Sequence, residues 1–85
     1  MEIVFTPEAR SDCAYWKRSG NVSVQNRITA LLKDMQQHPY TGIGKPERLK
    51  YNLTGTWSRR ITGEHRLVYS VENEIITIIS CRFHY

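Results

Sequence analysis

The sequence predicts an α+β fold in which two N-terminal helices pack on a mainly antiparallel sheet of four to five strands, in the order β-α-α-β-β-β-β. Two observations indicate this class. Apolar residues recur with a helical period between residues 7 and 38, and short runs typical of strands, rich in β-branched and aromatic residues, are separated by turn residues between residues 57 and 82. At 85 residues and 10.0 kDa, residues 1–85 are predicted to form a single domain, which excludes a two-domain enzyme.

The N-terminal half is predicted to contain one strand and both helices. Glu2–Phe5 reads as a short strand, and Thr6 followed by Pro7 and an acidic residue is typical of a helix start. This helix should run to about Ser19 and end at Gly20. Asn21 can cap a second helix that ends before Pro39. Their apolar stripes are predicted to be core: Ala9, Cys13 and Trp16 in the first helix, and Val24, Ile28, Leu31, Leu32 and Met35 in the second.

The C-terminal half reads as a loop followed by an antiparallel meander. Residues 38–46 hold two glycines and two prolines, which indicates a loop. Glycine or polar turn residues then separate four predicted strands: Glu47–Leu53, Trp57–Ile61, Arg66–Glu72 and Ile75–Arg82.

Positive charge is concentrated in the second half of the chain. Twelve basic against eight acidic residues give a net charge of +4. The excess is +1 over residues 1–44 and +3 over residues 45–85, where aromatic residues lie among the arginines. Arginine binds phosphate bidentately and aromatic rings stack on unpaired bases, so the pattern favours a nucleic-acid surface. The alternative is a solvated basic face without a binding role.

The sequence gives no support for a membrane protein, a secreted protein or a metal- or cofactor-binding protein. No apolar run is long enough to span a bilayer, and the N-terminus does not resemble a secretory signal, which predicts a cytoplasmic protein without a membrane role. Cys13 and Cys81 are predicted to be two reduced core thiols. Without a CxxC motif or a Cys/His spacing suited to zinc, neither a metal nor a cofactor is expected.

Strand alternation predicts a cluster of charged side chains on the helix-free face of the sheet. Arg59 and Arg60 must face opposite ways, and Arg82 and His84 share a face if the last strand continues regularly. Neighbouring strands could therefore bring together six residues: Arg60, Arg66, Arg82 and His84, beside Glu47 and Lys50.

Such a cluster suits RNA cleavage. The reaction needs a base for the ribose 2′-hydroxyl, an acid for the leaving 5′-oxygen and fixed positive charge for the phosphorane. Carboxylate, imidazolium and guanidinium groups can supply these near neutral pH. Each residue has an alternative reading. Glu47 could form a surface ion pair and His84 could be an idle exposed histidine. The arginines, including Arg59, could be strand residues without a binding role, and Tyr85 could simply pack against neighbouring side chains.

The C-terminal half also resembles a known family. The segments GKPE (44–47), WSRRI (57–61), EHRLVY (64–69) and CRFHY (81–85) together resemble the YoeB (Txe/YoeB) toxins of the wider RelE group. The resemblance implies the toxin of a type II toxin–antitoxin system with a fold like that of microbial ribonucleases. It also implies an endoribonuclease that cleaves mRNA in the ribosomal A site without metal, leaving 2′,3′-cyclic phosphate and 5′-hydroxyl ends.

The resemblance implies a role for each site residue. Glu47 would be the general base, His84 the general acid and Arg66 the clamp on the phosphate. The remaining site residues would bind substrate: Lys50 and Arg60 on the backbone, and Tyr85 on a base.

Partners follow from the same resemblance. It implies an acidic antitoxin, and the helices would meet the antitoxin, the ribosome or a second subunit of a homodimer. DNA would be bound only through the antitoxin complex. One alternative is an inhibitor that occupies the ribosome without cutting. A DNA-binding repressor acting alone is disfavoured, because no helix-turn-helix signal is present.

Overall fold

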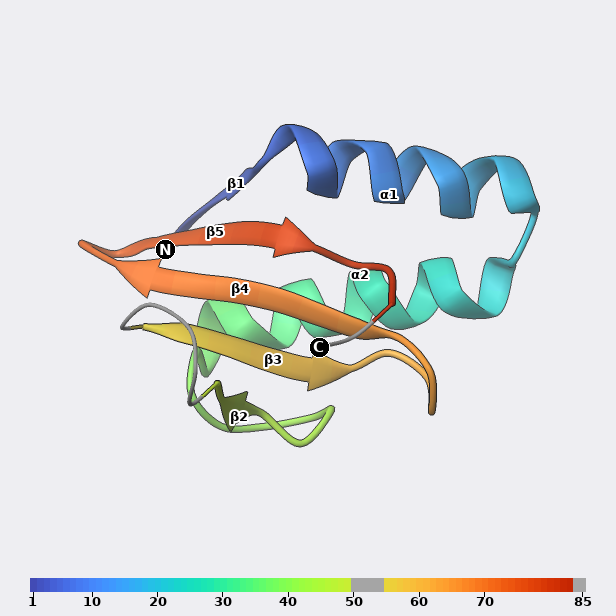
Figure 1. Ribbon diagram of the computed structural model, residues 1–85. Helices are drawn as coiled ribbons and strands as arrows, with labels where there is room; N and C mark the ends of the chain where they lie inside the picture. Colours follow the sequence, from blue (N-terminus) through green and yellow to red (C-terminus); the bar gives the residue numbers. More distant parts are fainter. Residues whose placement is uncertain (50–54, 84–85) are drawn as a thin grey trace.

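The computed structural model describes residues 1–49 and 55–83 of the chain (Figure 1). Its elements follow the predicted order: β1 (Glu2–Phe5), α1 (Pro7–Ser19), α2 (Val22–Gln37), β2 (Glu47–Arg48), β3 (Thr56–Arg60), β4 (Arg66–Glu72) and β5 (Ile75–Ser80).

The five strands form one sheet in the order β1-β5-β4-β3-β2. β1 pairs in parallel with β5, and every other pairing is antiparallel. Both helices lie on one side of this sheet, α1 alongside β1 and β5, and α2 behind β4 and β3 (Figure 1). The predicted α+β class is therefore confirmed, and within residues 1–49 and 55–83 the opposite face of the sheet carries no helix (Figure 1).

Local capping explains where the helices begin and end. The Thr6 hydroxyl accepts a hydrogen bond from the Ala9 N–H at 3.0 Å, and the Asn21 side chain accepts one from the Val24 N–H at 3.0 Å. Gly20 adopts φ +73°, the left-handed conformation that ends α1. In the described part of the chain, no helix is long and apolar enough to cross a membrane.

The core lies between the helices and the sheet. Its buried members include most of the predicted stripe residues and the inward residues of the strands: Ala9, Trp16, Val24, Ile28, Leu31, Met35, Leu67, Tyr69, Ile76 and Ile78. Cys81 is also buried, whereas Cys13 is only half-buried at the edge of the core. Both cysteines are free thiols. The prediction that both are core residues therefore holds in full only for Cys81.

The last predicted strand is shorter than expected. Strand β5 ends at Ser80 rather than at Arg82, and Phe83 adopts φ +63°. Residues of α1 bind both backbone groups of Cys81: its N–H donates to the Asp12 carboxylate at 3.0 Å, and its carbonyl accepts from the Trp16 indole at 2.8 Å. Because Cys81 has these partners, it does not extend the sheet, and the chain turns away.

The strand predicted over Glu47–Leu53 is also shorter, since β2 comprises only Glu47 and Arg48. The Leu49 N–H still donates to the Thr56 carbonyl at 3.0 Å. The remainder of this prediction, residues 50–53, lies outside the described residues.

Candidate active site

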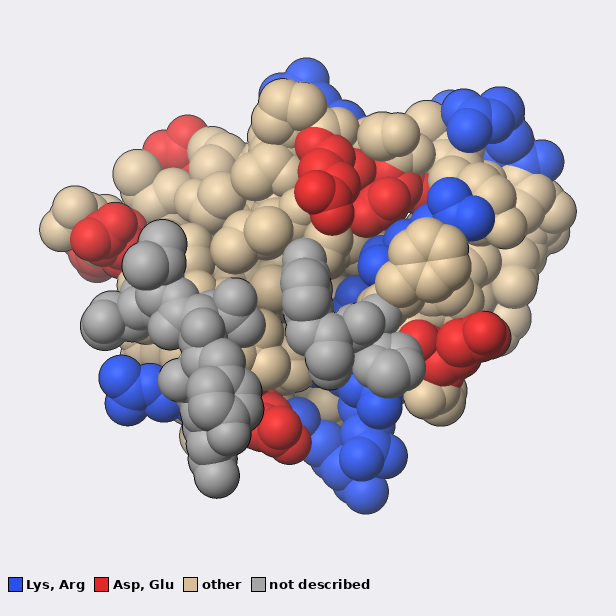
Figure 2. Space-filling model, viewed as in Figure 1, with Lys and Arg blue, Asp and Glu red and all other residues tan. Residues whose placement is uncertain are grey.

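A pocket of about 260 Å³ opens on the helix-free face, where β2, β3 and β4 lie side by side. Three basic side chains, one carboxylate and three smaller or apolar side chains line it: Lys45, Arg60, Arg66, Glu47, Leu49, Ser58 and Val68. Figure 2 shows Lys and Arg side chains gathered next to an acidic one in this region.

Strand register brings the charged side chains to this pocket. Glu47 pairs with Ser58 across β2 and β3, and Arg60 pairs with Arg66 across β3 and β4. Because side chains two residues apart on a strand share a face, Ser58 and Arg60 project the same way, and so do their partners. The predicted grouping of Glu47, Arg60 and Arg66 on one face is therefore observed.

Arg66 is held in place by backbone carbonyls. Its Nη1 atom lies 2.8 Å from the carbonyl of Thr62, 3.1 Å from that of His65 and 3.3 Å from that of Gly63. Its own N–H donates to the Phe83 carbonyl at 2.8 Å. These contacts orient the guanidinium before any ligand arrives, which reduces the entropy lost on binding an anion.

Lys45 reaches the pocket through an unusual backbone conformation. Gly44 has φ +80° and Lys45 has φ +51°, and the Gly44 carbonyl accepts a 2.7 Å hydrogen bond from the N–H of Arg60. A non-glycine residue at positive φ is strained, and such strain gathers at functional sites. Lys45 was not among the predicted site residues, although its position between Gly44 and Pro46, two residues before Glu47, was a usable signal.

The charge balance of the pocket favours an anionic ligand. Three cationic side chains face one carboxylate, an arrangement that attracts phosphate groups. Glu47 makes no ion pair within 4.0 Å among residues 1–49 and 55–83. The alternative role of Glu47 in a surface ion pair therefore finds no partner among those residues. The same residues contain no group of three or more His, Cys, Asp or Glu side chains that could hold a metal ion.

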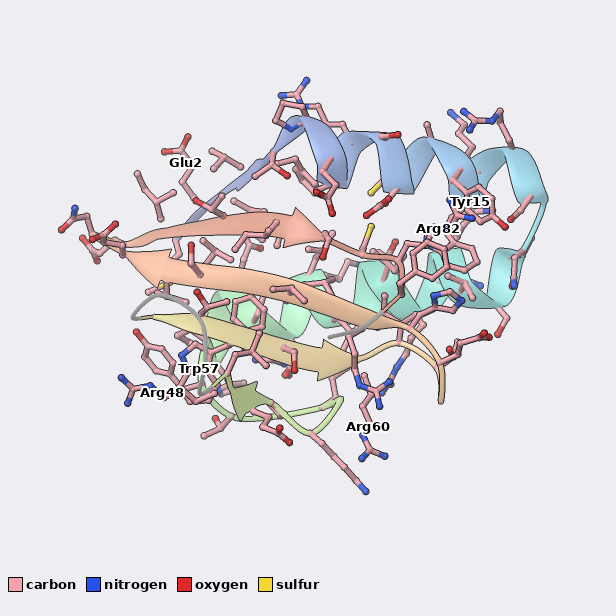
Figure 3. The ribbon with its side chains drawn as sticks, viewed as in Figure 1. Glu2, Tyr15, Arg48, Trp57, Arg60 and Arg82 are labelled. Carbon is pink, nitrogen blue, oxygen red and sulfur yellow. The ribbon has the colours of Figure 1, made fainter. Side chains whose placement is uncertain are left out.

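Arg82 does not join the cluster, so that prediction is wrong. Its guanidinium lies 3.4 Å from the ring centre of Tyr15 in α1 and 4.5 Å from that of Phe83. Figure 3 shows Arg82 beside Tyr15, well separated from Arg60. The reason is that β5 ends before Arg82, so strand alternation no longer determines its direction. Three further predicted site residues, Lys50, His84 and Tyr85, lie outside the described residues.

Arg59 has a structural role, although the sequence suggested only a strand residue without a specific function. It points to the helix side, where its side chain is completely buried. All five of its N–H hydrogens have acceptors: the Asp34 carboxylate, the Tyr69 hydroxyl and the carbonyls of His38, Thr41 and Ile43. Arg59 thereby anchors the loop that leads into Lys45 and Glu47.

Hydrogen bonds to Asp34 change its acidity. Bonds from the Arg59 guanidinium and the Ile43 N–H stabilise the charged form and hold the pKa of the Asp34 carboxyl below its ordinary value. Burial acts the opposite way on Tyr69, whose pKa is raised despite its bond from Arg59.

Comparison with known proteins gives one consistent result. Residues 5–85 match the model of the YoeB-like toxins of bacterial type II toxin–antitoxin systems. The chain is 46% identical over 85 residues to the toxin YoeB of Escherichia coli (strain K12), with both chains fully covered.

Solved structures agree with this match. A YoeB/ParE toxin from Agrobacterium tumefaciens superposes with a TM-score of 0.93 at 40% identity, with both chains fully covered. YoeB of Staphylococcus aureus superposes with a TM-score of 0.91 as a dimer (45% identity) and 0.87 in a YoeB–YefM complex (46% identity). All of this chain and 98% of each S. aureus chain are covered. From the matched residues and the shared fold, the chain belongs to the YoeB-like toxins of bacterial type II toxin–antitoxin systems.

Proposed function

We propose that this toxin is an endoribonuclease that cleaves mRNA in the ribosomal A site and so stops translation. The observation that carries the proposal is the placement of the Glu47 carboxylate in one pocket with the guanidinium groups of Arg60 and Arg66. A base beside fixed positive charge is what attack of a ribose 2′-hydroxyl on the adjacent phosphate requires.

In the proposed reaction, Glu47 takes the proton of the 2′-hydroxyl while its oxygen attacks phosphorus. Arg66 stabilises the extra negative charge of the phosphorane, and the carbonyls around its Nη1 atom support this role by fixing the guanidinium in advance. His84 protonates the leaving 5′-oxygen, which yields 2′,3′-cyclic phosphate and 5′-hydroxyl ends. The protein groups carry the proton transfers, so no metal or cofactor is needed.

Substrate binding is assigned to the neighbouring groups. Arg60 contacts the RNA backbone, together with Lys50, and Tyr85 stacks on a base. Lys45 lines the same pocket and adds a third described cation to it. Three cations around one carboxylate explain why a polyanion would be preferred over a neutral ligand.

Partners follow from the family. The solved S. aureus relatives are a YoeB dimer and a YoeB–YefM complex. We infer an acidic antitoxin for this toxin, attracted by the cationic pocket, and a homodimer as a second assembly. DNA is contacted only through the antitoxin complex, and the toxin acts on ribosomes in the cytoplasm.

Primer extension on translating ribosomes tests the proposal. The wild-type toxin should create discrete new 5′ ends within the A-site codon. Glu47→Gln, Arg66→Lys and His84→Gln should each lower the cleavage rate by about 10²–10⁴-fold while circular dichroism stays unchanged. The matched controls are Glu74→Gln, in an exposed turn, and Arg10→Lys, exposed on α1, which should cleave at the wild-type rate.

Two outcomes would overturn the proposal. Stalled ribosomes on intact message would identify an inhibitor that blocks without cutting. Undiminished cleavage by folded Glu47→Gln would remove this carboxylate from the reaction.

A further inference from the structure

Two thiols from distant parts of the chain lie together outside the pocket. The Sγ atoms of Cys13 in α1 and Cys81 after β5 are 3.6 Å apart, although 68 positions separate the residues in sequence. A disulfide bond is about 2.05 Å long, so the sulfur atoms need to approach by roughly 1.5 Å. Side-chain rotation with a small shift of α1 can close such a gap.

The backbone around Cys81 is already attached to α1. Asp12 accepts from the Cys81 N–H at 3.0 Å, and the Trp16 indole donates to its carbonyl at 2.8 Å. Both residues flank Cys13 on the same helix. A bond between the sulfur atoms would therefore add to contacts that exist, without requiring α1 and the C-terminal turn to find each other.

The two thiols differ in access. Cys81 is fully buried, whereas Cys13 is half-buried and lines a groove of about 230 Å³ between α1 and α2. Lys17 and Thr29 line the same groove. A small polar oxidant can therefore reach Cys13, while Cys81 is shielded from solvent and lies beside the Cys13 sulfur.

They also differ in acidity. The hydrogen bond with Cys81 lowers the pKa of the Cys13 thiol to about 7, although burial and the charge of Asp12 oppose this. The same bond and burial raise the pKa of the Cys81 thiol, which favours Cys81 as the partner that keeps its proton. Thiolate character together with exposure and a neighbouring thiol is typical of oxidant-reactive cysteines.

We propose that Cys13 and Cys81 form a peroxide-reactive site in which Cys13 is the attacking thiol and Cys81 the resolving thiol. The Cys13 thiolate attacks one oxygen of hydrogen peroxide, the O–O bond breaks, and the departing hydroxide takes up a proton as water. The product is a sulfenic acid on Cys13. The Cys81 sulfur then attacks the Cys13 sulfur, the S–O bond breaks, and hydroxide leaves as water with the proton of Cys81.

In balance, two thiols and one peroxide give one disulfide and two waters, and the two electrons lost by sulfur reduce the peroxide. The product ties α1 to the turn that follows β5. Closing so long a loop restricts the unfolded chain, and the melting temperature should rise by on the order of 10 °C. Disulfide formation does not depend on RNA cleavage, so its failure and that of the proposed function are separate results.

Peptide mapping of the purified protein tests the site. The reduced protein is treated with hydrogen peroxide, remaining thiols are alkylated, and trypsin is added. Cleavage after Arg10, Lys17, Arg66 and Arg82 places the cysteines in peptides 11–17 and 67–82. We expect these two peptides to appear joined, the intact mass to fall by two hydrogen atoms, and dithiothreitol to reverse both changes and the rise in melting temperature.

Variants identify the role of each thiol. Cys81→Ala should leave a sulfenic acid on Cys13 that dimedone traps, whereas Cys13→Ser should leave Cys81 reduced at the same peroxide dose. Two results with the wild-type protein would overturn the proposal: both cysteines still fully alkylated after peroxide, or Cys13 joined to Cys13 of a second molecule. Neither result depends on whether the variants fold.

Discussion

The Arg59 guanidinium lies 2.6 Å from the Asp34 carboxylate, on the opposite side of β3 from the adjacent Arg60. Arg59 is therefore enclosed by the fold, whereas Arg60 reaches the pocket. The buried one organises the loop from α2 to β2, and the exposed one is available to a ligand. Alternation of neighbouring residues across a sheet separates the two roles.

Replacing Arg59 should therefore destabilise the protein far more than replacing Arg60. Arg59→Met removes all five hydrogen bonds and leaves Asp34 without its ion pair, which should cost about 3 kcal/mol of unfolding free energy. Arg60→Met changes an exposed side chain and should cost less than about 0.5 kcal/mol. Urea unfolding of the two variants measures the difference, and equal costs would contradict the anchoring role of Arg59.

The Asp34–Arg59 pair should make stability depend on acid pH. The folded-state pKa of Asp34 lies below its ordinary value of 3.8, so its stabilisation is complete above that value and is lost as pH falls through the folded pKa. The difference in unfolding free energy between wild type and Asp34→Asn should therefore be largest at about pH 6 and narrow as pH falls below 3.8. A difference in unfolding free energy that does not change with pH would show that the charge of Asp34 does not contribute.

Gly44 should resist substitution because of both its conformation and its surroundings. An added Cβ would lie 2.7 Å from Leu31 Cδ2 and 3.2 Å from Arg59 Cβ, at a φ of +80°. Gly44→Ala should cost about 2–3 kcal/mol and reduce ligand binding through displacement of Lys45.

Two other glycines separate these causes. Gly20→Ala meets no atom within 4 Å but has φ +73°, so it should cost about 1 kcal/mol. Gly63→Ala has neither problem and should stay within about 0.5 kcal/mol of wild type. Urea unfolding of the three variants in parallel measures this order, and a cost at Gly63 as large as at Gly44 would contradict it.

Tyr15 should stabilise the C-terminal turn through its ring. Arg82 lies over the Tyr15 ring at 3.4 Å, a geometry worth about 1–2 kcal/mol when partly desolvated. A double-mutant cycle of Tyr15→Leu and Arg82→Met should give a coupling energy of this size. Tyr15→Phe keeps the ring and should retain most of the stability. A coupling near zero would mean that the two side chains touch without stabilising each other.

Alkylation should distinguish the two thiols by pH. Because the thiolate is the nucleophile and the pKa of Cys13 is lowered to about 7, its reaction with iodoacetamide should reach half of its maximal rate near pH 7. In Cys81→Ala the lowering hydrogen bond is absent, so the midpoint should move to higher pH. Mass spectrometry of peptide 11–17 follows the reaction, and an unchanged midpoint in the variant would assign the acidity to another cause.

Sequence patterns predicted the parts of this protein that depend on local interactions. Thr6 and Asn21 cap their helices through bonds three residues along the chain, which a local signal can reveal. Arg60 and Arg66 were predicted to share a face because strand alternation is a property of the backbone. The motifs of the C-terminal half likewise predicted that the chain belongs to the YoeB-like toxins.

Tertiary contacts decided what local patterns could not. Arg82 left the predicted strand because Asp12 and Trp16, far away in sequence, take the backbone groups of Cys81 that a longer ladder would have used. Arg59 is buried because helix α2, the loop after it and the Tyr69 hydroxyl of β4 together supply acceptors for every N–H of its side chain. Both outcomes depend on which distant groups meet once the chain is folded, and periodicity along a strand carries no information about those groups.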